Sequence, residues 1–378
     1  MLTKDKSLIP LSDPSREFQY IKDYFPSIQK EIKSGVYIGG KNVEKLEKKL
    51  AKFFDIKYVA SLNSGTDALA CAIYSLDIGK GDEVILPSFT FFATAEVVIN
   101  SGATPVFADV ELETQCMSLD KIKPLVTNKT KCIIPVHLYG NNSDIEKIKN
   151  FCSKKNIYLI EDCAQSFGSA TKSNKKLGTF GNVNAFSTYP SKTLGGIGDG
   201  GFITTNNKSI YQAINKYKNH GQTKTYDHVI SGINSRMDSV NAFTLLKKLE
   251  IFNQIKDTRN GVVKFYNNIF NNFNEIQSFN NDKKIIYNYY TIQLPPSKRA
   301  SVQEELRKDH IFTSIYYKKP LHKQKSLVDY GFKSKDLTNT NKLSKSVLSL
   351  PLYAFMTKKE KSYLQNSIKK VLKKYDIN

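Results

Sequence analysis

The chain has 378 residues, of which 40% are hydrophobic, and its 56 lysines and arginines outnumber 35 acidic residues to give a formal charge of +21. This length allows one large hydrophobic core and a smaller second one, since single cores stop growing at about 250–300 residues. No apolar run approaches the roughly 18 residues of a membrane-spanning helix, and the first residues lack the apolar stretch of a secretory signal. We therefore expect a cytoplasmic protein with two domains and no membrane contact.

The positive charge raises the alternative of nucleic-acid binding. That function requires basic residues clustered on one face or a known binding motif, whereas the lysines here are scattered along the chain. We expect no nucleic-acid partner, and a positive field that favours anionic small substrates. The cysteines are odd in number and form no C-x-x-C pair, so they predict buried thiols rather than a disulfide framework or a metal site. They are Cys71, Cys116, Cys132, Cys152 and Cys163.

Seven short β-branched or aromatic runs alternate with helical patterns between about residues 55 and 206, and glycine, proline or asparagine bounds each run. The runs are Tyr58–Leu62, Glu83–Pro87, Thr104–Asp109, Lys131–His137, Ile157–Asp162, Val183–Ser187 and Gly201–Thr205. Such nearly continuous apolar strands are typical of a mostly parallel sheet covered on both faces. The pattern therefore predicts an α/β domain with a mostly parallel, seven-stranded sheet sandwiched by helices.

The C-terminal third has a different character. Ala242, Leu245, Leu246 and Leu249 mark an amphipathic helix, after which lysine and asparagine dominate. A weaker strand signal at 287–293 and helical signals near the end predict a smaller α+β domain. We place the large domain, with its N-terminal segment, at residues 1–250 and the small domain at 251–378.

Polar and aromatic residues follow the predicted strands, where parallel sheets bind their ligands. Ser64, Gly65 and Thr66 follow the first strand and lead into a helix, whose free N–H groups would suit a phosphate. The alternative is a simple N-cap formed by Ser64 or Thr66. Phe91 and neighbouring aromatics follow the second strand, where they either stack on a flat ligand or pack in the core.

Two further residues complete a chemical set. Asp162 ends an apolar strand, where a carboxylate needs a positive partner. If its role is only structural, a nearby lysine or the positive end of a helix would be that partner. Lys192 follows the sixth strand and precedes a tract rich in glycine, which permits close backbone approach or forms a tight loop. A phosphate seat, a stacking surface, a carboxylate for a ring nitrogen and an amine for a Schiff base together indicate pyridoxal phosphate.

The chain resembles the DegT/DnrJ/StrS-type nucleotide-sugar aminotransferases, which are pyridoxal-phosphate enzymes of the aspartate-aminotransferase-like fold type I. The matching motifs run over nearly the whole chain, from residue 35 to residue 353. The most specific are Asn63-Ser-Gly-Thr-Asp-Ala-Leu69, Pro135-Val-His-Leu-Tyr-Gly140, Glu161-Asp-Cys-Ala-Gln165, Ser187-Thr-Tyr-Pro-Ser-Lys192 and Gly232-Ile-Asn-Ser-Arg-Met-Asp-Ser239.

This resemblance implies roles for individual residues. Lys192 would form the Schiff base and move the proton, Asp162 would pair with the ring nitrogen, and Gln165 would lie near the cofactor's phenolic oxygen. Phe91 would stack on the ring. Phosphate contacts are implied for Ser64, Gly65, Thr66, Ser187 and, from the neighbouring subunit, Asn234, so a homodimer with shared active sites is implied. Candidate sugar contacts are Tyr37, Tyr189, His220, His228, Tyr316 and His322, each of which has a purely structural alternative.

The resemblance further implies an activity. An amino group would pass from L-glutamate, through pyridoxamine phosphate, to a keto group of a UDP- or dTDP-linked hexose. The motif forms favour the 3-keto group, and the product would serve amino-sugar biosynthesis for lipopolysaccharide or another polysaccharide. Two alternatives share the scaffold: a sugar dehydratase, which replaces the lysine with histidine, and a regulatory protein that has lost the chemistry.

Overall fold

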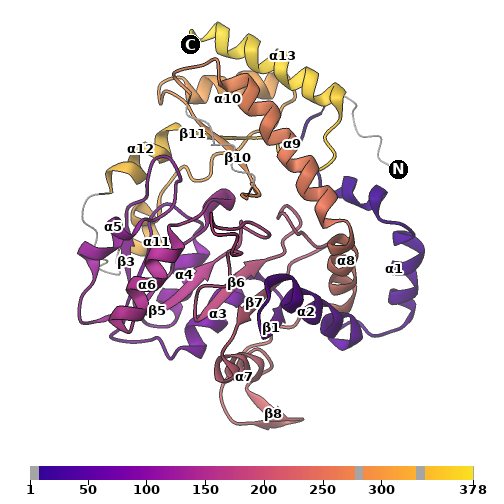
Figure 1. The fold of residues 1–378 in the computed structure, drawn as a ribbon, viewed down its shortest axis with the longest axis vertical. Helices are drawn as coiled ribbons and strands as arrows, with labels where there is room; N and C mark the ends of the chain where they lie inside the picture. The colour runs from indigo at the N-terminus through magenta and orange to yellow at the C-terminus, as the bar shows by residue number, and fades with distance from the viewer. Residues whose placement is uncertain (1–7, 277–283, 329–336, 378) are drawn as a thin grey trace.

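The computed structural model describes residues 8–276, 284–328 and 337–377. Seven strands of this part form one sheet in the order β1-β7-β6-β5-β4-β2-β3 (Figure 1). The pairs β2–β3, β2–β4, β4–β5 and β5–β6 are parallel, whereas β7 is antiparallel to β1 and β6. The strands are β1 (Tyr58–Leu62), β2 (Glu83–Pro87), β3 (Thr104–Ala108), β4 (Thr130–Ile133), β5 (Tyr158–Asp162), β6 (Val183–Ser187) and β7 (Gly201–Thr205).

All seven predicted strands are confirmed, and one differs clearly in length. The run predicted to extend to His137 forms ladder pairs only as far as Ile133. Pro135 has no N–H to donate to a ladder, so the regular strand ends before it. Val136 then makes only an isolated bridge with Asp162, and the His137 N–H donates to the Asp162 carbonyl at 3.0 Å. The chain thus leaves the sheet beside the end of β5.

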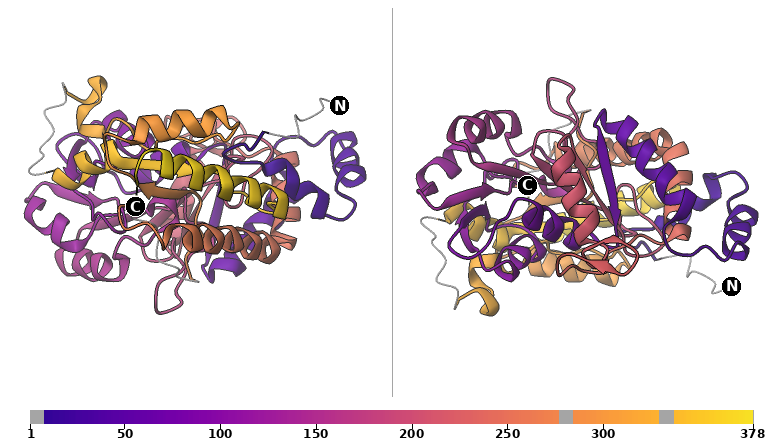
Figure 2. Two further views of the ribbon diagram at one scale, coloured as in Figure 1. Left: turned by 90° about the horizontal axis from the view of Figure 1, so that it is seen from above. Right: turned by 90° about the horizontal axis from the view of Figure 1, so that it is seen from below.

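Helices cover both faces of the sheet (Figure 2). Alternate side chains of β1 show the division, since Ala60 and Leu62 pack with α3 and α7 while Val59 packs with α2 and α8. The first face carries α3 (Gly65–Ser75), α4 (Ala93–Asn100) and α7 (Lys208–Tyr217). The opposite face carries α2 (Gly40–Phe54), α6 (Ile145–Lys155) and α8 (Ser239–Glu250). The predicted helix at residues 242–249 is confirmed as part of α8.

The C-terminal lobe is built around a two-stranded antiparallel sheet of β10 (Tyr290–Gln293) and β11 (Val347–Leu350). Helix α9 (Phe252–Phe270) runs from the end of α8 into this lobe (Figure 1). Its other helices are α10 (Arg299–Lys308), α12 (Thr338–Ser346) and α13 (Lys358–Lys374). The short helix α11 (Lys325–Val328) instead packs against the large domain, where Leu327 joins the apolar cluster that includes α3 (Figure 1). Elsewhere the chain forms α1 (Tyr24–Lys33), α5 (Leu119–Ile122) and the hairpin of β8 (Gln222–Lys224) and β9 (Asp227–His228).

We propose a domain boundary between residues 250 and 251, because α8 ends at Glu250 and α9 begins at Phe252. The first described residues nevertheless contact the second lobe, where Ile9 pairs with Ile311. Apolar residues of both lobes form one continuous cluster, which holds them together. All five cysteines are buried and free, as predicted. Among the described residues, no helix combines the length and apolarity needed to cross a membrane.

Candidate active site

The carboxyl ends of β1 and β6 meet the N-terminus of α3. Ser64 caps this helix, its Oγ accepting the N–H of Asp67 at 3.0 Å. Gly65 begins the helix against β6, where an added Cβ would lie 2.7 Å from the Cβ of Ser187. Glycine is therefore required for this close approach. The arrangement directs the unpaired N–H groups of the first helical turn and two hydroxyl groups toward one place, which suits an anion.

A cavity of about 690 Å³ opens above this helix terminus. The residues predicted to hold the cofactor line it from four strand ends. They are Ser64, Gly65, Thr66, Phe91, Asp162, Gln165, Ser187 and Lys192. Residues far apart in sequence thus converge because the strands that precede them share one edge of the sheet.

Asp162 is a buried carboxylate at the end of β5, only 4% exposed. It accepts hydrogen bonds from the Thr94 hydroxyl at 2.8 Å and from the Ala164 N–H at 3.1 Å. Burial raises its pKa, while these two bonds and the positive charge of Lys192 lower it. In the described part of the chain no basic side chain forms an ion pair with it. Within the described residues, Asp162 therefore lacks the cationic partner that its position in the sequence led us to expect.

Lys192 presents its amine to the same cavity. Burial lowers the pKa of this lysine to about 8, an effect that the charge of Asp162 partly opposes. Across residues 8–276, 284–328 and 337–377 its Nζ has no hydrogen-bond partner. A lysine with these properties is partly neutral near physiological pH and is free to act as a nucleophile or a base.

The preceding turn and the following glycines hold Lys192 in place. Its N–H donates to the carbonyl of Tyr189 at 2.8 Å. At Gly196 an added Cβ would lie 2.0 Å from Oδ1 of Asn241, a residue of α8. The glycine tract therefore lets α8 approach the lysine loop closely, which resolves the choice left open by the sequence between close approach and a simple tight loop.

Aromatic side chains form the cavity wall. Phe91 is 58% exposed, which excludes core packing as its role in this chain. Its ring centre lies 6.2 Å from that of Tyr317. Tyr189, Tyr289 and Tyr316 also line the cavity. The exposed face of Phe91 is thus available to stack on a flat ligand.

The six predicted sugar contacts divide into two groups. Tyr189 and Tyr316 line the cavity. Among the other four, the Tyr37 hydroxyl donates to the Ile32 carbonyl at 3.2 Å, and His220 and His228 lie exposed near the β8–β9 hairpin. His322 bonds through Nδ1 to the Ser88 hydroxyl at 2.7 Å. These four side chains do not line the cavity of the single chain.

Asn234 is also outside the cavity. It lies exposed on the surface, where its Oδ1 accepts the Nε–H of Arg236 at 2.9 Å. Conversely, the cavity contains Thr94, Tyr289 and Tyr317, which the sequence did not single out. Thr94 follows Phe91 by three residues, so its position after β2 was the signal that could have identified it. The two tyrosines come from the C-terminal lobe, and no motif marked them.

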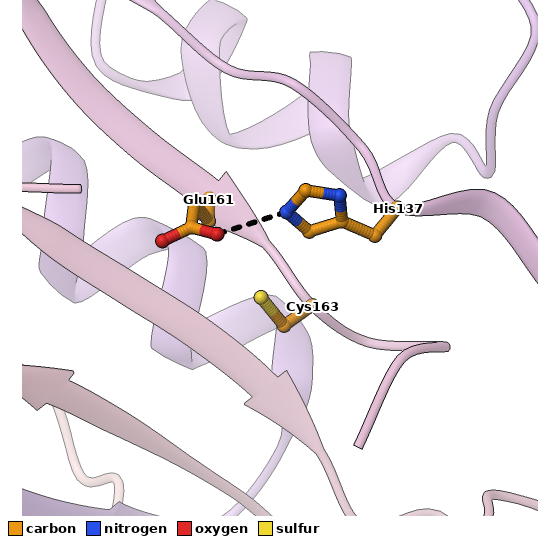
Figure 3. A group of neighbouring side chains, drawn as sticks. All are labelled: His137, Glu161 and Cys163. Carbon is orange, nitrogen blue, oxygen red and sulfur yellow. Dashed lines mark hydrogen bonds and ion pairs between the residues drawn. The ribbon is translucent and has the colours of Figure 1, made fainter. Parts of the chain in front are cut away.

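His137, Glu161 and Cys163 form a buried group beside the active site (Figure 3). Nε2 of His137 lies 2.9 Å from Oε2 of Glu161. Both Glu161 oxygens also accept backbone N–H groups, at 2.6–3.0 Å, from Gly178, Phe180 and Gly181. Burial raises the pKa of the Cys163 thiol, which keeps it protonated. The Glu161 oxygens are therefore engaged in hydrogen bonds and are not free to bind a metal ion. These bonds connect the loop at residues 178–181 to β5.

Comparison with known proteins places this geometry in a family. The sequence profile of the DegT/DnrJ/EryC1/StrS aminotransferase family matches residues 20–369. The chain belongs to this family. The profile match spans both lobes, as the motifs predicted.

Relatives with a stated activity are similar over most of their length. The UDP-2-acetamido-2-deoxy-3-oxo-D-glucuronate aminotransferase of Pseudomonas aeruginosa is 37% identical, over 92% of this chain and 96% of its own. The UDP-N-acetyl-3-dehydro-alpha-D-glucosamine 3-aminotransferase of Acidithiobacillus ferrooxidans is 33% identical, over 96% and 98%. A protein named pleiotropic regulatory protein, from Geobacillus stearothermophilus, is 32% identical, over 95% and 97%.

Solved structures share the fold. The structure of NtdA from Bacillus subtilis, with the bound cofactor PMP, has a TM-score of 0.90 and 28% identity, covering 99% of this chain and 87% of that one. The predicted aspartate-aminotransferase-like architecture is thereby confirmed.

Proposed function

We propose that this protein is a pyridoxal-phosphate-dependent aminotransferase that acts on a nucleotide-linked keto sugar. The observation that carries the proposal is the pair of Lys192 and Asp162 in one cavity: an unpartnered amine with a pKa of about 8, and a buried carboxylate without an ion-pair partner in the described residues. An enzyme with a structural lysine at this place would need neither feature.

The residues present fit pyridoxal 5′-phosphate. The first turn of α3 with Ser64, Thr66 and Ser187 would hold the phosphate. Asp162 would pair with the ring nitrogen, and the exposed ring of Phe91 would stack on the cofactor. When bound, the cofactor supplies a carbonyl group that takes up an amino group and a ring that accepts negative charge from the neighbouring carbon.

Lys192 has two tasks in this scheme. Its neutral amine would hold the cofactor through the carbonyl group in the resting enzyme. When not bound in this way, its Nζ would accept a proton from the donor carbon that bears the amino group and, in the second half-reaction, would give a proton to the sugar carbon. The pKa of about 8 suits both directions, because the protonated and neutral forms then coexist near neutral pH.

Asp162 and Thr94 keep a second proton in place. An ionised Asp162 would hold the proton on the ring nitrogen of the bound cofactor, since separating the pair would leave a buried charge without a partner. The Thr94 hydroxyl orients the carboxylate through its hydrogen bond of 2.8 Å.

The amino acceptor that we propose is the 3-keto group of a UDP-linked hexose. The names of the two enzymes from P. aeruginosa and A. ferrooxidans, both UDP-sugar aminotransferases with a 3-oxo or 3-dehydro substrate, support this choice. The net charge of +21 favours a substrate that carries a pyrophosphate. A dTDP-linked sugar is the alternative acceptor. The amino-sugar product would enter polysaccharide biosynthesis, and we place the enzyme in the cytoplasm, where nucleotide sugars are made.

A homodimer would complete the site. Several large apolar side chains are exposed: Tyr189 (52%) at the cavity, Tyr226 (89%) in the hairpin, and also Tyr37 (54%) and Ile197 (45%). A second copy of the chain would cover such residues. It would also bring Asn234 and the histidines His220 and His228 to a neighbouring cavity, which gives these exposed residues the roles that the family resemblance implies.

L-glutamate is the amino donor that we propose, and an absorbance spectrum tests it. The protein reconstituted with pyridoxal phosphate should show a visible band that decreases when L-glutamate is added, while near-ultraviolet absorbance of pyridoxamine phosphate grows. A UDP-linked 3-keto hexose should restore the visible band. The Lys192→Ala variant should bind pyridoxamine phosphate without turning over.

Three outcomes would contradict parts of this proposal. A visible band that glutamate leaves unchanged would remove the donor. Turnover by Lys192→Ala would remove the role of the lysine. A protein that takes up no cofactor would support the regulatory function suggested by the name of the G. stearothermophilus relative. The sugar dehydratase alternative is disfavoured, because position 192 is lysine rather than histidine.

A further inference from the structure

Tyr317 enters the active site from the C-terminal lobe. It lies between α10 and the short 3-10 helix Leu321–Lys323, and it lines the cavity. Its hydroxyl accepts a hydrogen bond from Nε2 of Gln165 at 3.1 Å. Its ring stands edge-on to Phe89 with a centroid separation of 6.3 Å. The side chain is therefore held by packing on one side and by Gln165 on the other.

Gln165 is fixed at both ends of its amide. Its Oε1 accepts the backbone N–H of Tyr139 at 2.8 Å, and its Nε2 donates to Tyr317. These two partners determine which end of the amide is oxygen and which is nitrogen, because an N–H must face an acceptor. An amide nitrogen carries two N–H groups. The second one has no partner in the described residues and belongs to a side chain that lines the cavity.

Tyr139 closes a circuit of hydrogen bonds. It adopts the left-handed conformation, with φ of 59°, and its hydroxyl donates to the carbonyl of Tyr316. The circuit therefore runs from Tyr316 through Tyr139 and Gln165 to Tyr317, the residue next to its starting point. It joins the segment after β4, the segment after β5 and the C-terminal lobe, so the direction of the Gln165 amide depends on the lobe that carries Tyr317.

We propose that Tyr317 is a positioning residue that orients Gln165 so that the free N–H of its amide donates to the phenolic oxygen of pyridoxal phosphate. This inference rests on the proposed function. The phenolic oxygen is attached beside the ring carbon that carries the carbonyl group, and the ring nitrogen is on the far side of the ring. A ring held between Lys192 and Asp162 would present that oxygen to the cavity wall, and Gln165, which lines the same cavity, has a free N–H to donate to it.

A pH titration of the visible band tests the proposal. A donated hydrogen bond stabilises the anionic form of the phenolic oxygen, so it lowers the pH at which the lysine-bound cofactor loses its proton. Without the Tyr317 hydroxyl the Gln165 amide keeps only its bond from the Tyr139 N–H, so the direction of Nε2 is no longer fixed and the midpoint should rise. For Tyr317→Phe we expect an upward shift of about one pH unit, typical of a lost hydrogen bond to a charged group.

Two further variants show whether Tyr317 acts through Gln165. Gln165→Ala should raise the midpoint at least as far, and the double variant should match Gln165→Ala alone. Tyr363→Phe is the control for loss of a tyrosine hydroxyl, because Tyr363 donates to the Asp309 carbonyl at 2.8 Å and does not line the cavity, and its midpoint should equal that of the wild type. The other titratable groups around Tyr317 are unchanged in every variant; they are Tyr139, Asp162, Tyr289, Tyr316 and, in the same cavity, Lys192.

The results separate this inference from the proposed function. A wild-type midpoint in Tyr317→Phe would overturn the inference, as would shifts in the double variant that add, since Tyr317 would then act on the cofactor directly. A wild-type protein with no visible band would reject the proposed function instead. Circular dichroism of each variant would confirm that the fold is kept, and Phe retains the ring that packs on Phe89.

Discussion

The hydrogen bond from Thr94 to Asp162 should control how cofactor affinity depends on pH. Thr94 is 1% exposed, and its hydroxyl lies 2.8 Å from Oδ2 of Asp162. Thr94→Val removes this donor and nearly keeps the shape of the side chain. Because burial already raises the pKa of Asp162 and the hydroxyl opposes that rise, its loss raises the pKa further. Cofactor binding needs the ionised carboxylate, so affinity should fail first at low pH.

The magnitude follows from the type of bond. A hydrogen bond to a charged group stabilises by about 1.5–3 kcal/mol. One pKa unit corresponds to about 1.4 kcal/mol, so the pKa of Asp162 should rise by about one to two units. The acid limb of the plot of pyridoxal-phosphate affinity against pH should move upward by the same amount.

The assay is the dissociation constant of pyridoxal phosphate, measured by absorbance over a pH series. Thr205→Val is the matched control, because this threonine is also buried and donates its hydroxyl to a carbonyl, that of Asn182 at 2.6 Å, but does not line the cavity. This control should keep the wild-type acid limb. If Thr94→Val has the same acid limb as the wild type, the carboxylate does not depend on this donor and the reasoning is refuted.

Two further predictions concern cofactor capture. The rate at which the apoprotein forms the visible band should rise with pH and level off above about pH 8, since only neutral Lys192 attacks and burial lowers its pKa to about 8. Stopped-flow mixing over a pH series measures this rate. A rate that is still rising at pH 10 would contradict the lowered pKa, because an ordinary lysine titrates near 10.4. Gly65→Ala should weaken pyridoxal-phosphate binding about tenfold, since overpacking costs about 1–3 kcal/mol and the new Cβ would lie 2.7 Å from that of Ser187. Gly198→Ala, whose Cβ meets nothing within 4 Å, is the control in the same equilibrium titration, and equal affinity in both variants would show that α3 yields without loss.

The sequence was most informative where one physical rule controls both pattern and structure. The seven strands were predicted because buried parallel strands need continuous apolar runs bounded by turn residues. The predicted end of β4 was wrong because apolar composition continues to His137, whereas the regular ladder ends at Ile133 and only an isolated bridge to Asp162 follows Pro135. The pattern of hydrophobicity does not contain information on which residues keep a ladder partner.

For the candidate site, too, the sequence predicted some residues and missed others. Ser64, Asp162 and Lys192 converge because each follows a strand of the same sheet, a relation that chain order alone predicts. Tyr317 and Tyr289 come from the other lobe, and their arrival depends on how the lobes pack, which no local pattern describes. His322 shows the opposite case, a residue that the sequence predicted for the site but that does not line the cavity. Its side chain forms a hydrogen bond with Ser88 instead.

The five buried cysteines can report where the folded chain opens. Burial raises the pKa of each thiol, so thiol reagents and mild oxidants should find no reactive thiolate in the folded chain. Each sulfur becomes available only when the segment around it opens. Cys71 lies in α3, the helix whose first turn forms the proposed phosphate site, and Cys152 lies in α6 on the opposite face of the sheet. The order in which a slow alkylating reagent labels these positions, with and without cofactor, would therefore map where ligand binding makes the fold harder to open.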